Sequence, residues 1–155
     1  MPFSIRSECD EEDRRFIEGL NPRLTEVIAA PTHSSTDVRS FQEAFTATAW
    51  RADGAKNATF LAIEETGKRI GYVNVREGSD DVLGEACGYI ALLAVEREHE
   101  GKGVAQSLVK QAERWAKEMG FSRLALDVFA SNEHALKFYE RAGFQPETVR
   151  VIKKL

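Results

Sequence analysis

Apolar residues recur at helical spacing through the first third of the chain. After a short predicted strand at Phe3–Ser7, residues 10–20 carry acidic side chains in a first helical turn and apolar side chains along one face. Residues 24–35 are expected to form a loop around a short helical piece, and Thr36 or Asp37 is expected to cap a second helix. The apolar positions of the two helices are Phe16, Ile17 and Leu20, then Val38, Phe41 and Phe45.

After residue 57 the pattern changes to the apolar runs of strands, separated by glycine-containing turns. The predicted strands are Thr59–Glu64, Arg69–Arg76, Glu85–Val95 and Arg123–Val128, with final strands at Phe144 and Val149–Leu155. The predicted helices are Gln106–Met119 and Asn132–Ala142, and they are closed by Gly120 and Gly143. Turns are expected at Asp53-Gly54, 65–68 and 78–81. An antiparallel first half followed by a strand–helix–strand unit predicts an α/β (α+β) fold with helices on a mixed sheet.

Composition narrows the class of protein. The chain has 155 residues, 43% of them apolar and 30% charged, and we expect a single domain over 1–155. A formal charge of −4 argues against non-specific nucleic-acid binding, which depends on Lys and Arg. No apolar run approaches the ~20 residues of a membrane span. Cys9 and Cys87 have no partner at zinc spacing, so we expect no metal site and a cytoplasmic protein with free thiols.

The most informative segment is the glycine-rich turn at Glu100-Gly101-Lys102-Gly103-Val104-Ala105, between an apolar strand and an amphipathic helix. The first backbone N–H groups of a helix have no partner within it, and the helix dipole adds partial positive charge there. Such a turn favours binding of an anion, most often a phosphate. The sequence therefore predicts a phosphorylated ligand.

Two motifs in this order resemble the GNAT superfamily of acyl-CoA-dependent N-acyltransferases. Residues 95–105 align without a gap with the family's signature turn, Val-Asp-Pro-Glu-Tyr-Arg-Gly-Lys-Gly-Ile-Gly. A second motif follows at the family's spacing, in Asn132, Ala135, Tyr139, Gly143 and Phe144. The resemblance implies a mostly antiparallel central sheet that is splayed at its middle and flanked by about four helices. It also implies acetyl-CoA as cosubstrate and a primary amine, in a small molecule or peptide, as acceptor.

The resemblance assigns cofactor-binding roles to particular residues. The backbone amides of Gly101, Lys102, Gly103, Val104 and Ala105 are expected to hold the CoA pyrophosphate. Backbone groups of the strand end are expected to bind the pantetheine arm, and one of their amides to polarise the thioester carbonyl. These strand residues are Leu93, Ala94 and Val95. In the family, the residue matching Asn132 also contacts the cofactor.

Catalytic roles follow from the same comparison. Tyr139 is expected to contact the cofactor and to act as the general acid that protonates the CoA thiolate. The strand position that is most often acidic in the family is Tyr89 here, so the sequence leaves the general base open between Glu85 and Glu96, each acting through water. His99 and His134 are expected to be exposed and without a catalytic role. Cys87 is expected to be a small core residue, because direct attack by an amine needs no acyl-enzyme.

Glu100 departs from the family, which usually has Arg or Gln at this position. A carboxylate beside a pyrophosphate is unfavourable, so Glu100 is expected to point away or to be compensated by Lys102, and Glu100→Arg is expected to lower the Michaelis constant for acetyl-CoA. A CoA-binding sensor or interaction module is the alternative function. The apolar segment Val149–Ile152 offers a sheet edge for a possible homodimer.

Overall fold

The computed structural model describes residues 2–26, 28–48 and 56–155, so Trp50 and the predicted turn at Asp53-Gly54 lie outside the described residues. Eleven elements are described. They are β1 (Phe3–Ser7), α1 (Glu11–Leu20), the 3₁₀ helix η1 (Asn21–Thr25), α2 (Ser35–Ala47), β2 (Asn57–Glu64), β3 (Arg69–Asp80), β4 (Glu85–Val95), the 3₁₀ turn η3 (Arg97–His99), α3 (Val104–Glu118), β5 (Leu124–Leu126) and α4 (Glu133–Arg141).

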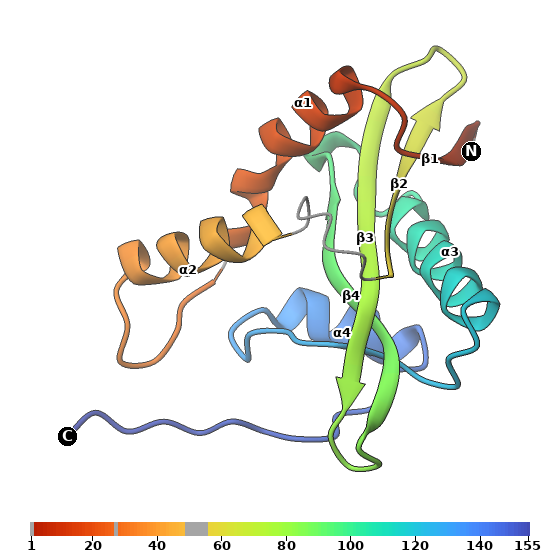
Figure 1. Ribbon diagram of the computed structural model, residues 1–155. Coiled ribbons are helices and arrows are strands. Elements are labelled where there is room, and N and C mark those ends of the chain that lie inside the picture. Colours follow the sequence, from red (N-terminus) through yellow and green to blue (C-terminus); the bar gives the residue numbers. More distant parts are fainter. Residues whose placement is uncertain (1, 27, 49–55) are drawn as a thin grey trace.

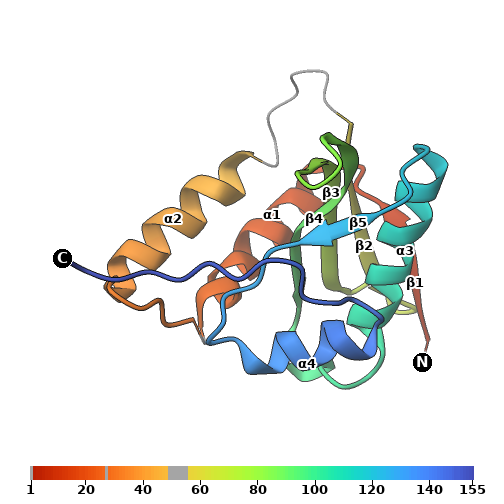
Figure 2. The ribbon, with the colours of Figure 1, turned by 90° about the horizontal axis from the view of Figure 1, so that it is seen from below.

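The strands form one sheet in the order β1-β2-β3-β4-β5. The first four strands are antiparallel neighbours, and β5 lies parallel to β4 after the α3 crossover. Helices α1 and α2 lie on one face of the sheet, and α3 lies on the other (Figures 1 and 2). This is the mixed, mostly antiparallel sheet with flanking helices that the sequence predicts.

Each face of the sheet buries its own hydrophobic core. Side chains of α3 pack with Ile70, Val73, Val75 and Ile90, and Phe138 and Tyr139 of α4 pack against this cluster. On the α1–α2 face the second core contains Ile17, Leu20, Leu61, Tyr72, Leu92 and Ala94, with Phe45 of α2 beside it. Cys87 is 2% exposed, so it is the core residue that the sequence predicts.

A bulge in β4 changes which face its side chains occupy. Asn74 of β3 pairs with Leu92, but the next residue, Val75, pairs with Ile90, so Ala91 is an extra residue in β4. Before the bulge Ile90 faces α3, and after it Leu92 faces the α1–α2 core. The bulge lies where the last pair between β4 and β5, Ile90 with Leu126, ends their contact.

Caps explain the ends of the helices. The Asp10 carboxylate accepts a hydrogen bond from the Asp13 amide at the start of α1. Ser34 and Asp37 form a capping box at the start of α2, so Ser34 is the cap, and the expectation of Thr36 or Asp37 is wrong by two or more residues. Gly120 and Gly143, both with positive φ, follow α3 and α4 as predicted.

The structure corrects two strand predictions. β3 continues through Asp80 with its turn at 81–84, so the turn predicted at 78–81 is wrong. Gly78 lies inside the strand, and its lack of a side chain is explained by packing, because a Cβ there would be 2.7 Å from the Tyr89 Cβ. The predicted final strands at Phe144 and Val149–Leu155 are not formed, and residues 145–155 run as an exposed tail that leaves the body of the molecule (Figure 1).

No helix among the described residues is long and apolar enough to cross a membrane.

Candidate active site

The glycine turn has the backbone geometry that an anion site needs. Gly101 and Gly103 have φ values of +73° and +82°, a region in which residues with a Cβ are strained. Gly103 is the N-cap of α3, and no side chain caps the helix there. A Cβ at either glycine would meet no atom within 4 Å, so no described side chain packs against the turn at these two positions. The structure thus places the predicted residues from Gly101 to Ala105 together around free helix N–H groups.

The strand end beside this turn leaves one backbone edge without a partner strand among the described residues. β4 stays paired with β3 as far as Val95, but its pairing with β5 ends at Ile90. Leu93, Ala94 and Val95 therefore present backbone groups at an opening between the two strands. This is the splay at which the pantetheine arm is expected.

Arg23 of η1 reaches across to both parts of this site. Its Nη1 donates to the Val95 carbonyl oxygen, and its Nη2 lies 2.5 Å from the Glu100 carboxylate. Beside it, Arg97 Nη2 lies 2.7 Å from the Glu26 carboxylate. Glu100 is therefore compensated by Arg23, a partner that the sequence did not indicate, and not by Lys102.

The second motif begins α4. The Asn132 side-chain oxygen Oδ1 accepts a hydrogen bond from the Ala135 amide at 3.2 Å, so the predicted capping role is confirmed. The Tyr139 ring packs edge-on against Phe138 and Phe144. Burial raises the pKa of Tyr139 to about 12, so its hydroxyl keeps its proton at neutral pH.

The two candidate bases lie apart from one another. Glu85 begins β4, at the opposite end of the strand from the glycine turn, and its carboxylate is 3.9 Å from Arg123. Glu96 follows the strand and pairs with Lys68 at 3.2 Å. Both carboxylates thus already have a basic neighbour, and neither lies next to the Ile90–Leu126 pair where the splay begins.

His99 differs from its expected exposure. Its side chain is 8% exposed, and Nε2 lies 2.6 Å from the Glu64 carboxylate of β2. Nδ1 is buried and lies 3.5 Å from Glu96, without hydrogen-bond geometry. The hydrogen bond to His99 is the main cause that lowers the pKa of Glu64. His99 therefore ties the residues before the glycine turn to the β2–β3 hairpin.

Comparison with known proteins shows which family has this arrangement of strands, helices and glycine turn. The model of the Acetyltransferase (GNAT) family matches residues 23–144. The chain belongs to the GNAT family. The uncharacterized N-acetyltransferase YdgE of Bacillus subtilis is 31% identical over 103 residues, which are 66% of this chain and 64% of YdgE. The chain matches less than two thirds of the length of this and the other leading curated relatives.

Solved structures agree on the fold. The "Putative acetyl transferase from Pyrococcus furiosus" superposes with a TM-score of 0.78 at 24% identity, over 99% of both chains. AAC(6')-Iy, in complex with the bisubstrate analog CoA-S-monomethyl-acetylneamine, superposes with a TM-score of 0.69 at 23% identity, over 100% of this chain and 99% of its own. The splayed sheet described above is thus the GNAT fold.

On the α1–α2 face of this GNAT fold, aromatic and polar side chains gather between α2 and the β4–β5 opening. Phe41 contacts both Phe45 and Phe129, the latter from the loop after β5. The Arg76 guanidinium stacks on Phe45. Tyr89 donates a hydrogen bond of 2.6 Å to the carboxylate of Asp127. Sequence reasoning missed this last contact because its two residues are 38 positions apart.

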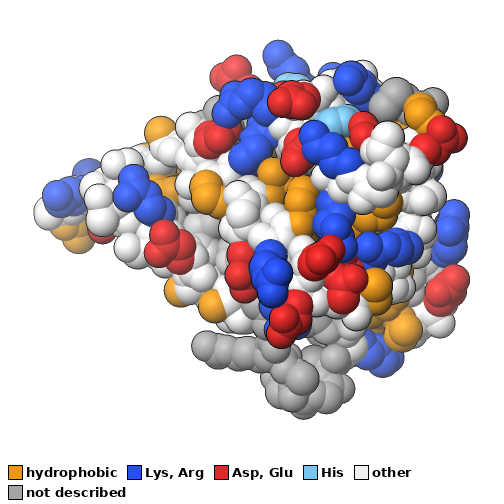
Figure 3. All heavy atoms as spheres, turned by 90° about the horizontal axis from the view of Figure 1, so that it is seen from above, with side chains coloured by type: hydrophobic (Ala, Val, Ile, Leu, Met, Phe, Trp, Pro, Cys, Tyr) orange, Lys and Arg blue, Asp and Glu red, His pale blue; other side chains and the backbone are white. Residues whose placement is uncertain are grey.

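Charge is mixed on the face of the GNAT domain shown in Figure 3. Acidic and basic side chains are interspersed there, with hydrophobic side chains visible between them. This face carries no single-sign field of the kind that binds nucleic acid non-specifically.

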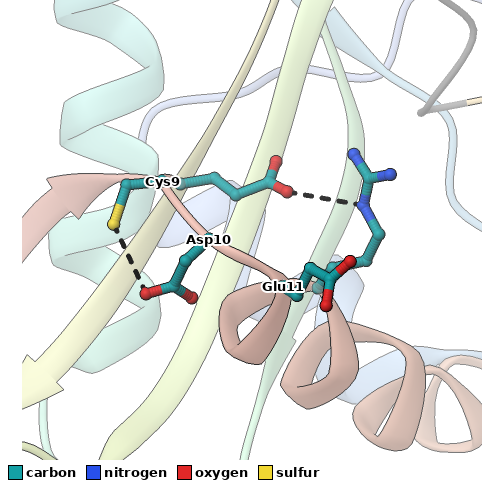
Figure 4. A pocket seen from close by; sticks show the side chains of 5 residues that line it. Cys9, Asp10 and Glu11 are labelled. Atoms are coloured by element: carbon teal, nitrogen blue, oxygen red, sulfur yellow. Dashed lines mark hydrogen bonds and ion pairs between the residues drawn. The ribbon is translucent and has the colours of Figure 1, made fainter.

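A recess at the β1–α1 connection is a separate feature (Figure 4). It is lined by Glu8, Cys9, Asp10, Glu11 and Arg14. Cys9 and Asp10 point toward one another, with Sγ and the carboxylate 3.8 Å apart. Ligand atoms of Cys9, Asp10 and Asp13 lie within 4.8 Å of one another, but the Asp13 carboxylate already receives Arg6 and Arg69. We interpret this cluster as support for the first turn of α1.

Proposed function

We propose that this chain is an N-acetyltransferase that moves the acetyl group of acetyl-CoA directly to a primary amine of a small molecule or peptide. The observation that carries the proposal is the glycine turn at the start of α3, which lies beside the end of β4, where β4 is no longer paired with β5. A GNAT neighbour bound to a CoA-containing bisubstrate analogue supports the same cosubstrate. We propose further that residues 1–155 act as one cytoplasmic domain.

The residues of the site have distinct roles in this proposal. The amides of Gly101 through Ala105 bind the pyrophosphate, and Asn132 contacts the cofactor near the start of α4. The backbone of Leu93, Ala94 and Val95 binds the arm and polarises the thioester carbonyl. Acetyl-CoA supplies an activated acyl group, so the reaction needs a general acid and a general base and no metal ion.

Tyr139 holds the proton that the leaving group needs. As the amine nitrogen bonds to the carbonyl carbon, the C–S bond breaks and the Tyr139 hydroxyl protonates the thiolate. Its raised pKa keeps this proton in place at neutral pH before the reaction. Tyr139→Phe is therefore expected to lower turnover by about 100-fold, within the usual range for a lost general acid, while the Kd of acetyl-CoA changes little.

The first test is thermal stabilisation by acetyl-CoA. A ligand that binds the native state at 100 times its Kd adds about 2.7 kcal/mol, so the melting temperature should rise clearly. Gly103→Glu is expected to abolish this rise. Gly67→Glu is the matched control, because Gly67 also has a positive φ of 89° but lies in the β2–β3 hairpin, away from the turn.

The outcomes separate the two functions. A rise that Gly103→Glu abolishes and Gly67→Glu keeps, followed by acetylation of an amine, supports the enzyme. The same rise without turnover of any amine favours the CoA-binding sensor or interaction module. No rise at millimolar acetyl-CoA would contradict both.

A further inference from the structure

We propose that Tyr89 and Asp127 are the proton-accepting pair of the acetyl transfer. The Tyr89 hydroxyl takes a proton from the attacking amine nitrogen while it gives its own proton to the Asp127 carboxylate. This inference rests on the proposed function and supplies the general base that the sequence left open between Glu85 and Glu96.

The position of the pair carries the inference. Tyr89 Oη lies 2.6 Å from Asp127 Oδ2. Tyr89 immediately precedes Ile90, and Asp127 immediately follows Leu126, and Ile90 with Leu126 is the last pair between β4 and β5. The hydrogen bond therefore bridges the two strands at the point where they begin to separate. The same opening is where the thioester of the bound arm is expected.

The pair faces the side from which an amine would enter. Tyr89 pairs with Arg76 across β3 and β4, and Arg76 stacks on Phe45 of α2, so both lie on the α1–α2 face. Tyr139 belongs to the core on the opposite, α3 face. A base on one face and an acid on the other keep the group that accepts a proton from the nitrogen apart from the group that donates one to the sulfur.

Neighbouring residues fix the Tyr89 side chain. Gly78 of β3 leaves room for it, because any Cβ at Gly78 would clash with the Tyr89 Cβ. The guanidinium of Arg76, which pairs with Tyr89 across the strands, is held by the Asn74 side-chain oxygen at 3.0 Å and by Thr48 at 2.9 Å. The hydroxyl thus has a fixed direction toward Asp127.

The protonation state of Tyr89 fits a relay. Burial, and secondly the hydrogen bond to Asp127, raise the pKa of Tyr89, while Arg76 opposes this effect. The phenol therefore stays neutral and cannot lose its proton to bulk water at neutral pH. It can pass the proton to Asp127 only as it receives another, which links the transfer to attack by the nitrogen.

The proton balance closes without a further reactant. The amine nitrogen attacks the carbonyl carbon, the C–N bond forms, and one N–H proton moves through Tyr89 to Asp127. The C–S bond breaks, and Tyr139 protonates the thiolate. Asp127 is exposed, so it returns its proton to solvent, and Tyr139 regains one from the same source.

The competing carboxylates provide the controls. Asp127→Asn and Tyr89→Phe are compared with Glu85→Gln and Glu96→Gln. The probes are neamine, spermidine and a short peptide that begins with alanine. CoA release is followed with a thiol reagent. The signal of the exposed Cys9 is measured in a blank without acetyl-CoA and is subtracted from the assay signal. The Kd of acetyl-CoA is measured for each variant in parallel.

We expect Asp127→Asn and Tyr89→Phe each to lower kcat/KM for the amine by about 100-fold, the lower end of general-base contributions, with an unchanged Kd for acetyl-CoA. Asp127→Glu should recover part of this loss. Near-normal kcat/KM in Asp127→Asn would overturn the inference. So would a larger loss in Glu85→Gln or Glu96→Gln.

A second measurement does not depend on the amine. In protein labelled with ¹³Cζ-tyrosine, the Tyr89 resonance, assigned with Tyr89→Phe, should shift in Asp127→Asn. An unmoved resonance would overturn the pair, whichever amine the protein accepts. If instead acetyl-CoA gives no thermal stabilisation while the resonance shifts as expected, the proposed function fails and the hydrogen-bonded pair stands.

Discussion

Asp13, in the first turn of α1, is a carboxylate with no exposed surface. Arg6 binds it with two hydrogen bonds of 2.6 and 2.8 Å, Arg69 Nε adds a third at 2.6 Å, and the Cys9 amide adds a fourth. The hydrogen bonds from Arg6 are the largest cause that lowers the pKa of Asp13; burial opposes them, and the hydrogen bonds from Arg69 and Cys9 lower it further. One side chain thus joins β1, α1 and β3.

Asp13→Asn is expected to destabilise the protein by about 3 kcal/mol, because it leaves partly buried guanidinium groups without their counter-charge. The folded-state pKa of Asp13 lies below the unfolded value of about 3.9, so its contribution is complete above that pH and is lost as the pH falls below it. Urea unfolding between pH 7 and pH 3 measures this.

The matched control is Glu12→Gln, since Glu12 is 71% exposed and lies 3.5 Å from the same Arg69. An exposed pair contributes little, so this change should cost at most about 1 kcal/mol. Equal losses in the two variants, or a wild-type stability that does not fall toward pH 3, would contradict the role given to Asp13.

Individual residues differ in how far the sequence predicts them. The capping role of Asn132 follows from its place directly before a helix pattern, because a cap and its helix are adjacent in sequence. The burial of His99 and the bond between Tyr89 and Asp127 do not, because their partners are 35 and 38 positions away and are joined only by sheet pairing.

Among the elements, η1 and the glycine turn are held together by charge. Arg23 pairs with Glu100, and Glu26 pairs with Arg97, so two ion pairs join the same two segments. Arg23 also binds the Val95 carbonyl, one of the groups expected to receive the pantetheine arm. The segment before α2 is thereby coupled to the proposed cofactor site.

Arg23→Ala is expected to weaken acetyl-CoA binding by about fivefold, because it leaves the Glu100 carboxylate uncompensated near the pyrophosphate. This factor corresponds to the ~1 kcal/mol between two charges 4 Å apart in water. In a Glu100→Gln background the same change should have a much smaller effect, and the double-mutant cycle measured by calorimetry gives the coupling.

Arg97→Ala is the control, since it breaks the other ion pair and leaves Glu100 with its partner. Independent effects of Arg23→Ala and Glu100→Gln would contradict the compensation. Because Arg23 already neutralises Glu100, the gain expected from Glu100→Arg is smaller than the sequence alone suggests.

Element boundaries follow the sequence where local signals mark them. β1 and β4 have the predicted bounds, and α3 ends before the predicted Gly120. β3 is longer than predicted because Gly78 serves a close contact with a neighbouring strand and not a turn. The sequence signal of a glycine is the same in both cases, and only the partner strand decides between them.

At the scale of the whole molecule, the C-terminal tail does not pack against the rest of the described protein. Val149, Val151 and Leu155 are 79%, 87% and 109% exposed. The alternating apolar pattern that predicts a strand is present, but among the described residues no strand pairs with it. We propose that these side chains are buried only when two copies associate.

Deleting residues 149–155 should therefore leave the melting temperature of dilute protein within about 2 °C, which for a chain of this size corresponds to less than 1 kcal/mol. In the full chain, melting temperature and apparent mass should rise with protein concentration, and the deletion should remove both trends. A large loss of stability in the dilute deletion variant would mean that the tail packs on its own body.

The fold class was within reach of the sequence, because two motifs in register determine the family and the family determines the sheet. The splay itself could not be located from apolar periodicity, since the extra residue Ala91 sits inside an uninterrupted apolar run. The site therefore depends on a feature that leaves no mark in composition.

The extra residue Ala91 also determines which β4 side chains face each side of the sheet. Strict alternation would put Tyr89, Ala91 and Leu93 on one face of the sheet. With the bulge, Leu92 and Ala94 instead face the α1–α2 core, on the same face as Tyr89. If one residue were deleted at this point, either the Tyr89 hydroxyl or the Leu92 side chain would have to face α3 instead of the α1–α2 core. Length is therefore constrained at position 91 more tightly than side-chain identity, and substitutions there should be tolerated where deletions are not.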